Sequence, residues 1–318
     1  MTGRNTVLLT FLTAVALAAC SAPAGGAPGS PSPDGSSPSA AATGTESPTA
    51  SPPASPSELP SSVPSAESPS SQPSGSGPAG TMTVRNYYFL DDATGGDPGL
   101  VPVLRTVPKS SAVARAAITA LLAGPTTSED GAKPPIVSWI PDGTRLLGIG
   151  VSGGTATVDL SSTFTAHNAT FSVGGRIAQV AYTLTQFPTV DRVVVKVGGT
   201  EIAALSPATR ATFRDTYQPP MFVDLPAWGA ALDDGGRVAG SANVFEAQFR
   251  IALLDAKGDT LFDRPVLATC GSGCWGTFSL TASYTVPSAQ TGTLRVWDPS
   301  EIDGSPQNVR EYPVRLTP

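Results

Sequence analysis

Residues 21–80 constrain this chain more than any other segment, because they cannot contribute to a globular core. More than half of them are Ser or Pro, and the segment contains no Lys, Arg, Ile, Phe, Tyr or Trp. Such a composition buries too little apolar surface to offset the entropy lost on ordering. We therefore expect a disordered linker, which leaves residues 81–318 as the foldable part of the 318-residue chain.

The residues before the linker have the pattern of an export signal. One positive charge, Arg4, precedes an apolar run from Val7 to Ala19 that is too short to span a bilayer. The run ends in Leu-Ala-Ala-Cys20, which resembles the lipobox of bacterial lipoproteins. That resemblance implies that Cys20 receives a diacylglyceryl group and becomes the new N-terminus. The alternative is an ordinary signal peptide that is cleaved after a small residue.

The leader and the linker together predict a protein that works outside the cytoplasmic membrane. Lipid on Cys20 would hold the chain on the outer face of that membrane, so membrane lipid is an expected partner. A fully extended linker could place the folded part ~180 Å from the anchor. The high Ala, Val and Arg content relative to Lys is consistent with a GC-rich genome and an actinobacterial cell envelope.

Charge and motif content exclude several classes of function. The net charge is −6, and subtracting the +1 of the leader and the −4 of the linker leaves −3 for residues 81–318. Both signs are interspersed without a basic stripe, so nucleic acid is not an expected partner. The sequence has one histidine, His167, in a polar stretch, which is typical of a surface loop. No nucleophile elbow, zinc-ligand set or phosphate-binding glycine loop is present, so we expect no enzyme, cofactor or metal.

Residues 83–205 predict an α+β unit. Extended apolar runs alternate with two stretches of helical periodicity, the first after Ser110 or Ser111 as a possible cap and the second ending before Pro188. A Ser152-Gly153-Gly154 turn joins two further runs as a hairpin. Two amphipathic helices beside a few strands favour a two-layer sandwich.

Several motifs in this region resemble the GerMN domain, which is named for part of a spore-germination lipoprotein. They occur in the same order over about 120 residues and are Tyr87-Tyr88-Phe89, Pro102–Arg105, Leu121–Pro125, Ile140–Thr144, Val158–Ser161 and Thr183–Gln186. The resemblance implies a compact α+β fold similar to ring-building modules of sporulation and secretion channels. The chain carries one copy rather than a tandem pair.

Residues from Pro219 onward predict a β-sandwich. Short alternating runs are separated by turn signals such as Asp233–Gly236 and Ala256–Asp259. The region also resembles Gmad2, the immunoglobulin-like domain found in spore-germination-type lipoproteins. The residues that carry this resemblance are Pro226, Gly240–Ala242, Asn243–Ala247, Gly276–Phe278, Ser300–Ser305 and Tyr312–Leu316.

Cys270 and Cys274 are predicted to form a structural disulfide. Three residues separate them, whereas redox motifs usually have two, and an exported chain favours oxidation. The short ring would contribute little entropic stabilisation. A redox-active or metal-binding role is the alternative.

Three other features near the C-terminus remain open as binding candidates. The acidic cluster of Asp298, Ser300, Glu301 and Asp303 could supply oxygen ligands to calcium, although its spacing is not that of an EF-hand. Trp228 and Trp275 could stack on sugars, whereas Trp297 is expected in the core. Glu246, within the resemblance to Gmad2, is either part of a capped turn or of a contact surface.

The sequence therefore predicts four segments: a lipoprotein signal peptide at 1–20, a linker at 21–80, a GerMN domain at 81–206 and a Gmad2 domain at 218–318. Each folded domain is expected to have its own apolar core. The expected function is that of a non-enzymatic, membrane-anchored envelope lipoprotein that contacts an unknown protein of an extracytoplasmic assembly. The alternative is a binding or sensor-accessory module for a cell-wall polymer or another ligand.

Overall fold

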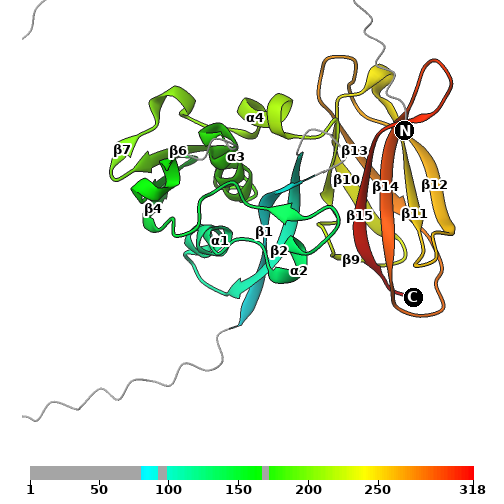
Figure 1. Ribbon diagram of the computed structural model, residues 1–318, viewed down its shortest axis with the longest axis horizontal. Helices are drawn as coiled ribbons and strands as arrows, with labels where there is room; N and C mark the ends of the chain where they lie inside the picture. Colours follow the sequence, from blue (N-terminus) through cyan, green and yellow to red (C-terminus); the bar gives the residue numbers. More distant parts are fainter. Residues whose placement is uncertain (1–79, 92–98, 167–171) are drawn as a thin grey trace, which may run out of the picture. The chain divides into compact units, whose positions relative to one another are not determined.

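The computed structural model describes residues 80–91, 99–166 and 172–318. Residues 72–318 group into one compact unit by their contacts. The signal peptide, Cys20, almost all of the linker and His167 lie outside the described residues. Within the described part of the chain, an N-terminal α+β domain precedes a C-terminal β-sandwich, which confirms the predicted fold class (Figure 1).

The N-terminal domain contains two sheets. The first has the order β2-β1-β3 and the second the order β4-β5-β6-β7. Its strands are β1 (Thr81–Leu90), β2 (Gly99–Pro108), β3 (Ile136–Val137), β4 (Leu146–Ser152), β5 (Thr155–Leu160), β6 (Arg192–Val197) and β7 (Thr200–Glu201). Its helices are α1 (Val113–Leu122), α2 (Thr127–Asp130), α3 (Val173–Leu184) and α4 (Arg210–Tyr217), with 3-10 turns at Ser162–Thr165 and Ala203–Leu205.

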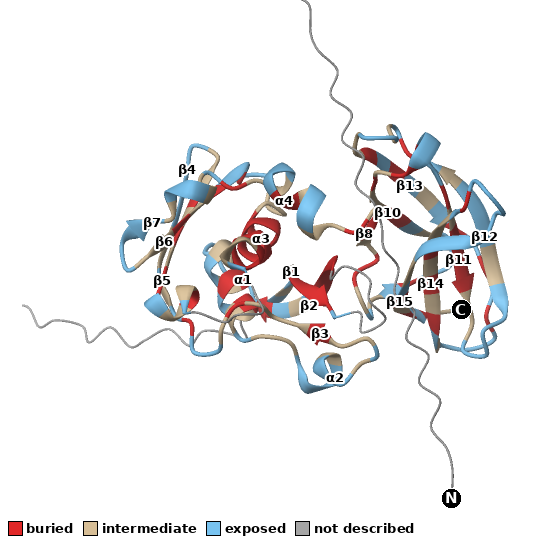
Figure 2. Cartoon of the chain, turned by 45° about the horizontal axis from the view of Figure 1, so that its top comes forward, coloured by how far each residue is buried: buried red, intermediate tan, exposed pale blue. Residues whose placement is uncertain are grey.

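Helices α1 and α3 lie between the two sheets, so the domain has more layers than the two expected from the sequence. Helix α3 contacts β1 on one side and β6 on the other, and α1 contacts both β1 and β4. Ten of the twelve residues of α3 are buried, as Figure 2 shows in red. A helix in a two-layer sandwich would expose one face. The small residues Gly175, Ala178 and Ala181 allow α3 to be covered on all sides.

Local sequence signals set most of these element boundaries. The Ser172 hydroxyl accepts a hydrogen bond from the Gly175 amide and caps α3. Gly153 and Gly154 have positive φ in the tight turn between β4 and β5. Helix α1 begins after Ala112, one or two residues later than a cap at Ser110 or Ser111 predicts, and Ala112 provides no side-chain cap. The Ser110 hydroxyl instead accepts from the Ala112 backbone amide, before the helix begins.

The C-terminal domain packs a sheet of order β13-β10-β8 against one of order β12-β11-β14-β15-β9. This is the sandwich that the alternating runs predict. Its strands are β8 (Met221–Leu225), β9 (Ala231–Leu232), β10 (Gly236–Ala242), β11 (Gln248–Leu254), β12 (Thr260–Leu267), β13 (Gly276–Ala282), β14 (Gln290–Pro299) and β15 (Pro306–Leu316). A 3-10 turn, η3 (Phe245–Ala247), precedes β11.

Strand β12 is a feature that the sequence analysis did not identify. It has little apolar alternation and contains Pro265, which lacks an amide donor. Both properties are tolerated because β12 is the edge strand of its sheet and pairs only with β11.

The apolar core is continuous through both domains rather than divided at their boundary. Strand β1 is buried on both faces, because α1 and α3 cover it within its domain and β8 approaches it from the other. Tyr87 of β1 stacks near Phe222 of β8, with ring centroids 6.4 Å apart, and meets Tyr182 of α3 edge-on at 5.5 Å. The expectation of two separate cores is therefore wrong at this contact.

Candidate functional site

The first candidate site is a depression at one end of the β-sandwich, which we call the tip depression. It has a volume of about 480 Å³ and is formed by η3, the start of β11 and the turn between β14 and β15. Two of its apolar side chains are unusually exposed, Ile302 at 96% and Phe245 at 56%. Its lining residues are Phe245, Glu246, Gln248, Asp298, Pro299, Ser300, Glu301, Ile302 and Gln307.

The rim of the tip depression is acidic. Glu246, Asp298 and Glu301 line it, and its described lining residues include no Lys or Arg. Asp298 accepts a hydrogen bond from the side-chain amide of Asn308 at 3.0 Å. Among the residues that the structure describes, no group of three or more His, Cys, Asp or Glu is arranged to hold a metal ion. Glu246, Asp298 and Glu301 give the depression a negatively charged border.

The loop that contains the Cys270–Cys274 disulfide supports the backbone beneath Phe245. Glu246 and Ala247 have positive φ values of 51° and 59°, a conformation that costs non-glycine residues free energy. The Ser272 hydroxyl accepts from the Glu246 amide at 2.8 Å, and the Ser272 amide donates to the Val244 carbonyl at 2.8 Å. Two hydrogen bonds from one loop thus hold the exposed phenylalanine in position.

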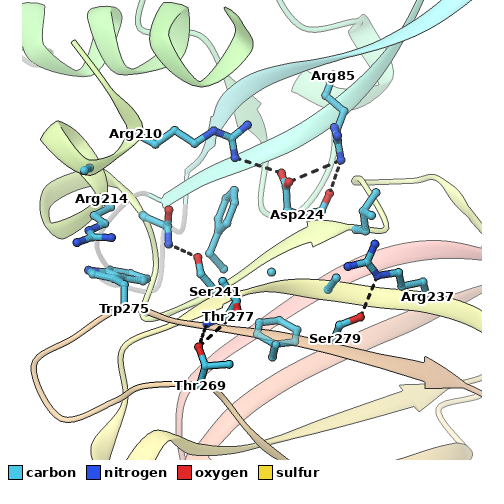
Figure 3. A pocket seen from close by; sticks show the side chains of 17 residues that line it. Arg85, Arg210, Arg214, Asp224, Arg237, Ser241, Thr269, Trp275, Thr277 and Ser279 are labelled. Atoms are coloured by element: carbon cyan, nitrogen blue, oxygen red, sulfur yellow. Dashed lines mark hydrogen bonds and ion pairs between the residues drawn. The ribbon is translucent and has the colours of Figure 1, made fainter. Parts of the chain in front are cut away.

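The second candidate site is a cleft between the N-terminal and C-terminal domains, which we call the arginine cleft (Figure 3). Its volume is about 740 Å³. Among the described residues that line it, four are arginines and one is acidic. These charged residues are Arg85 from β1, Arg210 and Arg214 from α4, Arg237 from β10, and Asp224 from β8.

A network centred on Asp224 joins the two domains at this cleft. The Tyr87 hydroxyl donates to Asp224 at 2.6 Å and accepts from the Arg210 guanidinium at 2.9 Å. Asp224 also forms ion pairs with Arg85 at 3.6 Å and with Arg210 at 3.7 Å. The Arg210 guanidinium lies about 5 Å from the ring centroids of Tyr87 and Tyr182, at 5.0 and 4.9 Å. One carboxylate thus connects strand β1, helix α4 and strand β8.

Burial favours the protonated form of the two tyrosine hydroxyls near Asp224. It raises the pKa of the Tyr87 hydroxyl well above its usual range, against the opposing effect of the Arg210 charge. Tyr182 has its pKa raised for the same principal reason. Both hydroxyls therefore remain protonated at every physiological pH, and Tyr87 serves as a permanent donor to Asp224.

Arg214 and Arg237 differ from the other two arginines because they form no ion pair within the described residues. The Arg214 Nε is buried without a hydrogen-bond acceptor. The Arg237 Nε donates to the Ser279 hydroxyl at 2.9 Å, which leaves its terminal nitrogens facing the cleft. Figure 3 places Arg214 beside Trp275 at one end of the cleft and Arg237 beside Ser279 at the other.

The three tryptophans that the sequence analysis considered lie in three different environments. Trp275 lines the arginine cleft, and its indole N–H donates to Asp215. Trp228 packs edge-on against Tyr312, with ring centroids 6.2 Å apart, and its amide donates to the Pro102 carbonyl of the N-terminal domain. Trp297 is half-buried rather than in the core. The Arg295 guanidinium lies 5.5 Å from its ring centroid, because residues two apart on a strand share a face. The Arg250 guanidinium lies 5.8 Å from the same centroid, because Arg250 of β11 is the cross-strand partner of Trp297.

The sequence analysis missed helix α4 and hence two of the four cleft arginines. Signals for it were present: Thr209 caps the helix through the Thr212 amide, and Phe213 and Tyr217 are spaced four residues apart. Arg210 and Arg214 have the same spacing, which places both on one face. The convergence of these arginines with Arg85 and Arg237 depends on domain packing, which no local pattern contains.

Comparison with known families identifies both domains. A model described as "Germane: Sporulation and spore germination" matches residues 86–203, and one described as "Gmad2: Immunoglobulin-like domain of bacterial spore germination" matches residues 221–305. Neither description names a catalytic activity. No curated protein sequence matches the chain.

Solved structures with similarity to the chain include domains from sporulation proteins. The first GerMN domain of the sporulation protein GerM from Bacillus subtilis is 23% identical, with a TM-score of 0.30, and the match covers 37% of this chain and 85% of that one. The tandem GerMN domains of the same protein are 16% identical, with a TM-score of 0.32, over 64% of this chain and 62% of that one. CopC from Methylosinus trichosporium OB3b is 18% identical, with a TM-score of 0.20, over 29% of this chain and 87% of that one.

No helix among the described residues is both long and apolar enough to cross a membrane. The residues that the sequence analysis assigned to the lipid anchor, including Cys20, are outside the described part.

Proposed function

The chain is a GerMN–Gmad2 protein of the spore-germination type, and we propose that it is a lipid-anchored, non-enzymatic interaction protein of the bacterial cell envelope. Lipid on Cys20 would provide the anchor, and the linker at 21–80 would extend the two domains away from the outer face of the membrane. The domains would then contact a protein of an extracytoplasmic assembly through the tip depression.

The exposure of Ile302 and Phe245 at one depression is the observation that carries this proposal. Soluble proteins expose single apolar side chains commonly, but an aromatic and an aliphatic side chain flanking one pocket are typical of protein contact sites. At 96% and 56% exposure, both side chains have most of their apolar surface in water. Burial under a partner would recover about 25 cal/mol for each Å² covered.

The acidic rim specifies the chemistry of the partner. A complementary surface would present an apolar centre that receives Phe245 and Ile302, surrounded by Lys or Arg facing Glu246, Asp298 and Glu301. The rim charges would mainly increase the association rate and orient the encounter, and that effect would weaken as salt rises. The disulfide loop supports the proposal because it fixes Phe245 before binding, which lowers the entropic cost of association.

Crosslinking in cells tests the proposed contact. A photoreactive residue at position 302 should capture one protein reproducibly, whereas the same residue at Leu147 should not. Leu147 is a matched control because it is also an exposed aliphatic residue, at 51%, but lies on β4 of the N-terminal domain. Equal capture at both positions, or none at either in correctly localised protein, would contradict an interface at the tip.

The arginine cleft favours a second candidate function, the binding of an anionic envelope polymer. Paired arginines and an aromatic ring are the groups that bind phosphate or carboxylate groups and sugar rings. This candidate does not require the tip depression, so each site can be tested alone.

A further inference from the structure

We propose that the arginine cleft binds a polyanionic chain whose phosphate groups are joined by hydroxyl-bearing polyol or sugar units. This inference rests on the second function proposed above, the binding of an anionic polymer. Three properties of the cleft support it: its uncompensated charge, its hydroxyl groups and its size.

The charge of the cleft is opposite in sign to that of the whole protein. The chain carries −6, whereas four arginines and one aspartate line the cleft. Asp224 compensates only Arg85 and Arg210, with which it forms ion pairs. Arg214 and Arg237 retain their charge, which produces a local positive potential in a concave surface where field lines are focused.

The two uncompensated arginines have free donors of the geometry that phosphate requires. A guanidinium presents a planar fork of N–H groups that matches two oxygens of a phosphate or carboxylate. Arg214 lines the cleft and forms no ion pair within the described residues. Its Nε is buried without an acceptor, so contact with an anion falls to the terminal nitrogens of the guanidinium. Arg237 uses Nε for Ser279 and leaves its outer nitrogens available.

Hydroxyl groups occupy the space between these two arginines. Ser241 and Thr277 lie in the middle of the cleft in Figure 3, with Thr269 below them and Ser279 beside Arg237. Hydroxyls both donate and accept, so they can pair with the hydroxyls of a polyol or a sugar. The indole of Trp275, held by its bond to Asp215, adds a flat apolar surface at the Arg214 end.

The same lining is less suited to an acidic peptide. A peptide binds most effectively where an open strand edge can pair with its backbone N–H and C=O groups. The cleft is instead lined by side chains of β8, β10 and β13. The central strand β10 is paired on both sides, so only the outer edges of β8 and β13 have backbone groups that are not paired within this sheet. At the start of β13, the Thr269 backbone amide donates to the Thr277 carbonyl, and the Thr277 backbone amide donates to the Thr269 hydroxyl. A polymer without peptide groups has no backbone N–H or C=O that would need a partner in this cleft.

Size sets the length of the expected ligand. A volume of about 740 Å³ is within the range for sites that hold an extended small molecule and exceeds the needs of one phosphate ion. Because Arg214 and Arg237 lie at opposite ends, one ligand must carry at least two anionic groups to engage both. Inorganic phosphate alone should therefore bind weakly.

Calorimetric titration with poly(glycerol phosphate) tests the proposal. The protein from residue 21 onward, with its linker and both domains, should bind this polymer at least tenfold more tightly than polyglutamate of equal charge. The double variant Arg214→Gln/Arg237→Gln should bind the polymer about 10- to 100-fold more weakly, since each arginine forms charge-assisted hydrogen bonds. Affinity should fall with added salt, and less steeply in the variant.

Arg192→Gln/Arg264→Gln is the matched control, because it removes the same charge from two exposed arginines outside the cleft. It should bind as the unmodified protein does. If the cleft variant does not fold, Arg214→Lys takes its place, because lysine keeps the charge without the planar fork and should weaken binding several-fold.

Three results would overturn the proposal. They are no binding of the polymer at millimolar concentration, equal losses in the cleft and control variants, and binding of polyglutamate as tight as that of poly(glycerol phosphate). The last result would assign the cleft to an acidic peptide instead.

Discussion

Replacing Asp224 by alanine should destabilise the protein more than breaking any exposed ion pair, because Asp224 joins both domains. The variant loses the 2.6 Å hydrogen bond from Tyr87, and bonds of this kind to a charged acceptor contribute about 1.5–3 kcal/mol. It also loses two ion pairs whose side chains are roughly a quarter exposed. After solvent screening, these pairs add at most about 1 kcal/mol together.

The expected loss of unfolding free energy is therefore about 2–4 kcal/mol. For a folded region of this size, that corresponds to a fall in Tm on the order of 10 °C. Asp224→Asn should have a smaller effect, since the amide oxygen can still accept from Tyr87. Urea unfolding followed by tryptophan fluorescence, together with calorimetric melting, measures both changes.

Asp263→Ala is the matched control for this prediction. Asp263 forms an ion pair with Arg250 at 2.8 Å, shorter than either ion pair of Asp224, but both side chains are more than a third exposed. Its removal should cost no more than about 1 kcal/mol. If Asp224→Ala and Asp263→Ala were equally stable, the Asp224 network would not join the domains as described.

Four further predictions concern other parts of the chain. Cys20→Ala should leave an unprocessed precursor or release soluble protein, and a processed, lipid-labelled species in the membrane fraction of that variant would rule out the anchor. Peptide mass spectrometry without reduction should find Cys270 linked to Cys274, and two alkylatable thiols in protein from the native envelope would contradict the disulfide. Gly240→Ala should destabilise the protein by about 3 kcal/mol, because a Cβ at this position would overlap the Phe222 carbonyl. Gly150→Ala should not destabilise it, because the space around Gly150 is open, and equal unfolding midpoints for the two variants would be inconsistent with this packing. Burial alone would raise the pKa of Glu129, but hydrogen bonds from Arg105 and Thr126 lower it overall. Glu129→Gln should therefore be less stable than the unmodified protein at neutral pH, and this difference should disappear as pH falls below 4.5, the pKa of the unfolded state. A difference that is independent of pH would refute this coupling.

Local patterns in the sequence were sufficient to predict most elements of the fold. The hairpin at Ser152–Gly154 has positive φ at both glycines, as a tight turn requires. The second helix begins at its serine cap, and five of the sandwich strands, β8, β10, β11, β13 and β14, coincide with the alternating runs. These elements depend on residues that are close together in the sequence, so hydrophobic periodicity and turn residues are sufficient to predict them.

Features that depend on contacts between distant segments were not predictable in this way. Helix α3 is covered on all sides because two sheets enclose it, and its own periodicity could not show the second sheet. Strand β12 is stabilised by its pairing with β11 rather than by an alternating pattern. Similarly, Arg85 and Arg237 lie 152 positions apart in the numbering and meet at one cleft only because β1 and β10 belong to packed domains.

The candidate sites were likewise predictable only where they depend on residues that are close together in the sequence. The sequence analysis placed Asp298 and Glu301 in one acidic cluster but gave no reason to group Glu246 with them. The structure places all three in the lining of the depression that contains Phe245 and Ile302. The disulfide was proposed from spacing and compartment, yet its support of η3 through Ser272 became apparent only in three dimensions. Exposure of an apolar side chain is a property of the fold and cannot be read from residue type.

The most direct test of the central claim, that this protein acts by contact and not by catalysis, is complementation of a deletion strain. The account predicts that Phe245→Ala/Ile302→Asp, folded and correctly localised, fails to restore the deletion phenotype, whereas His167→Ala restores it fully. Failure of His167→Ala together with full rescue by the tip variant would contradict the account and indicate a catalytic role for the histidine.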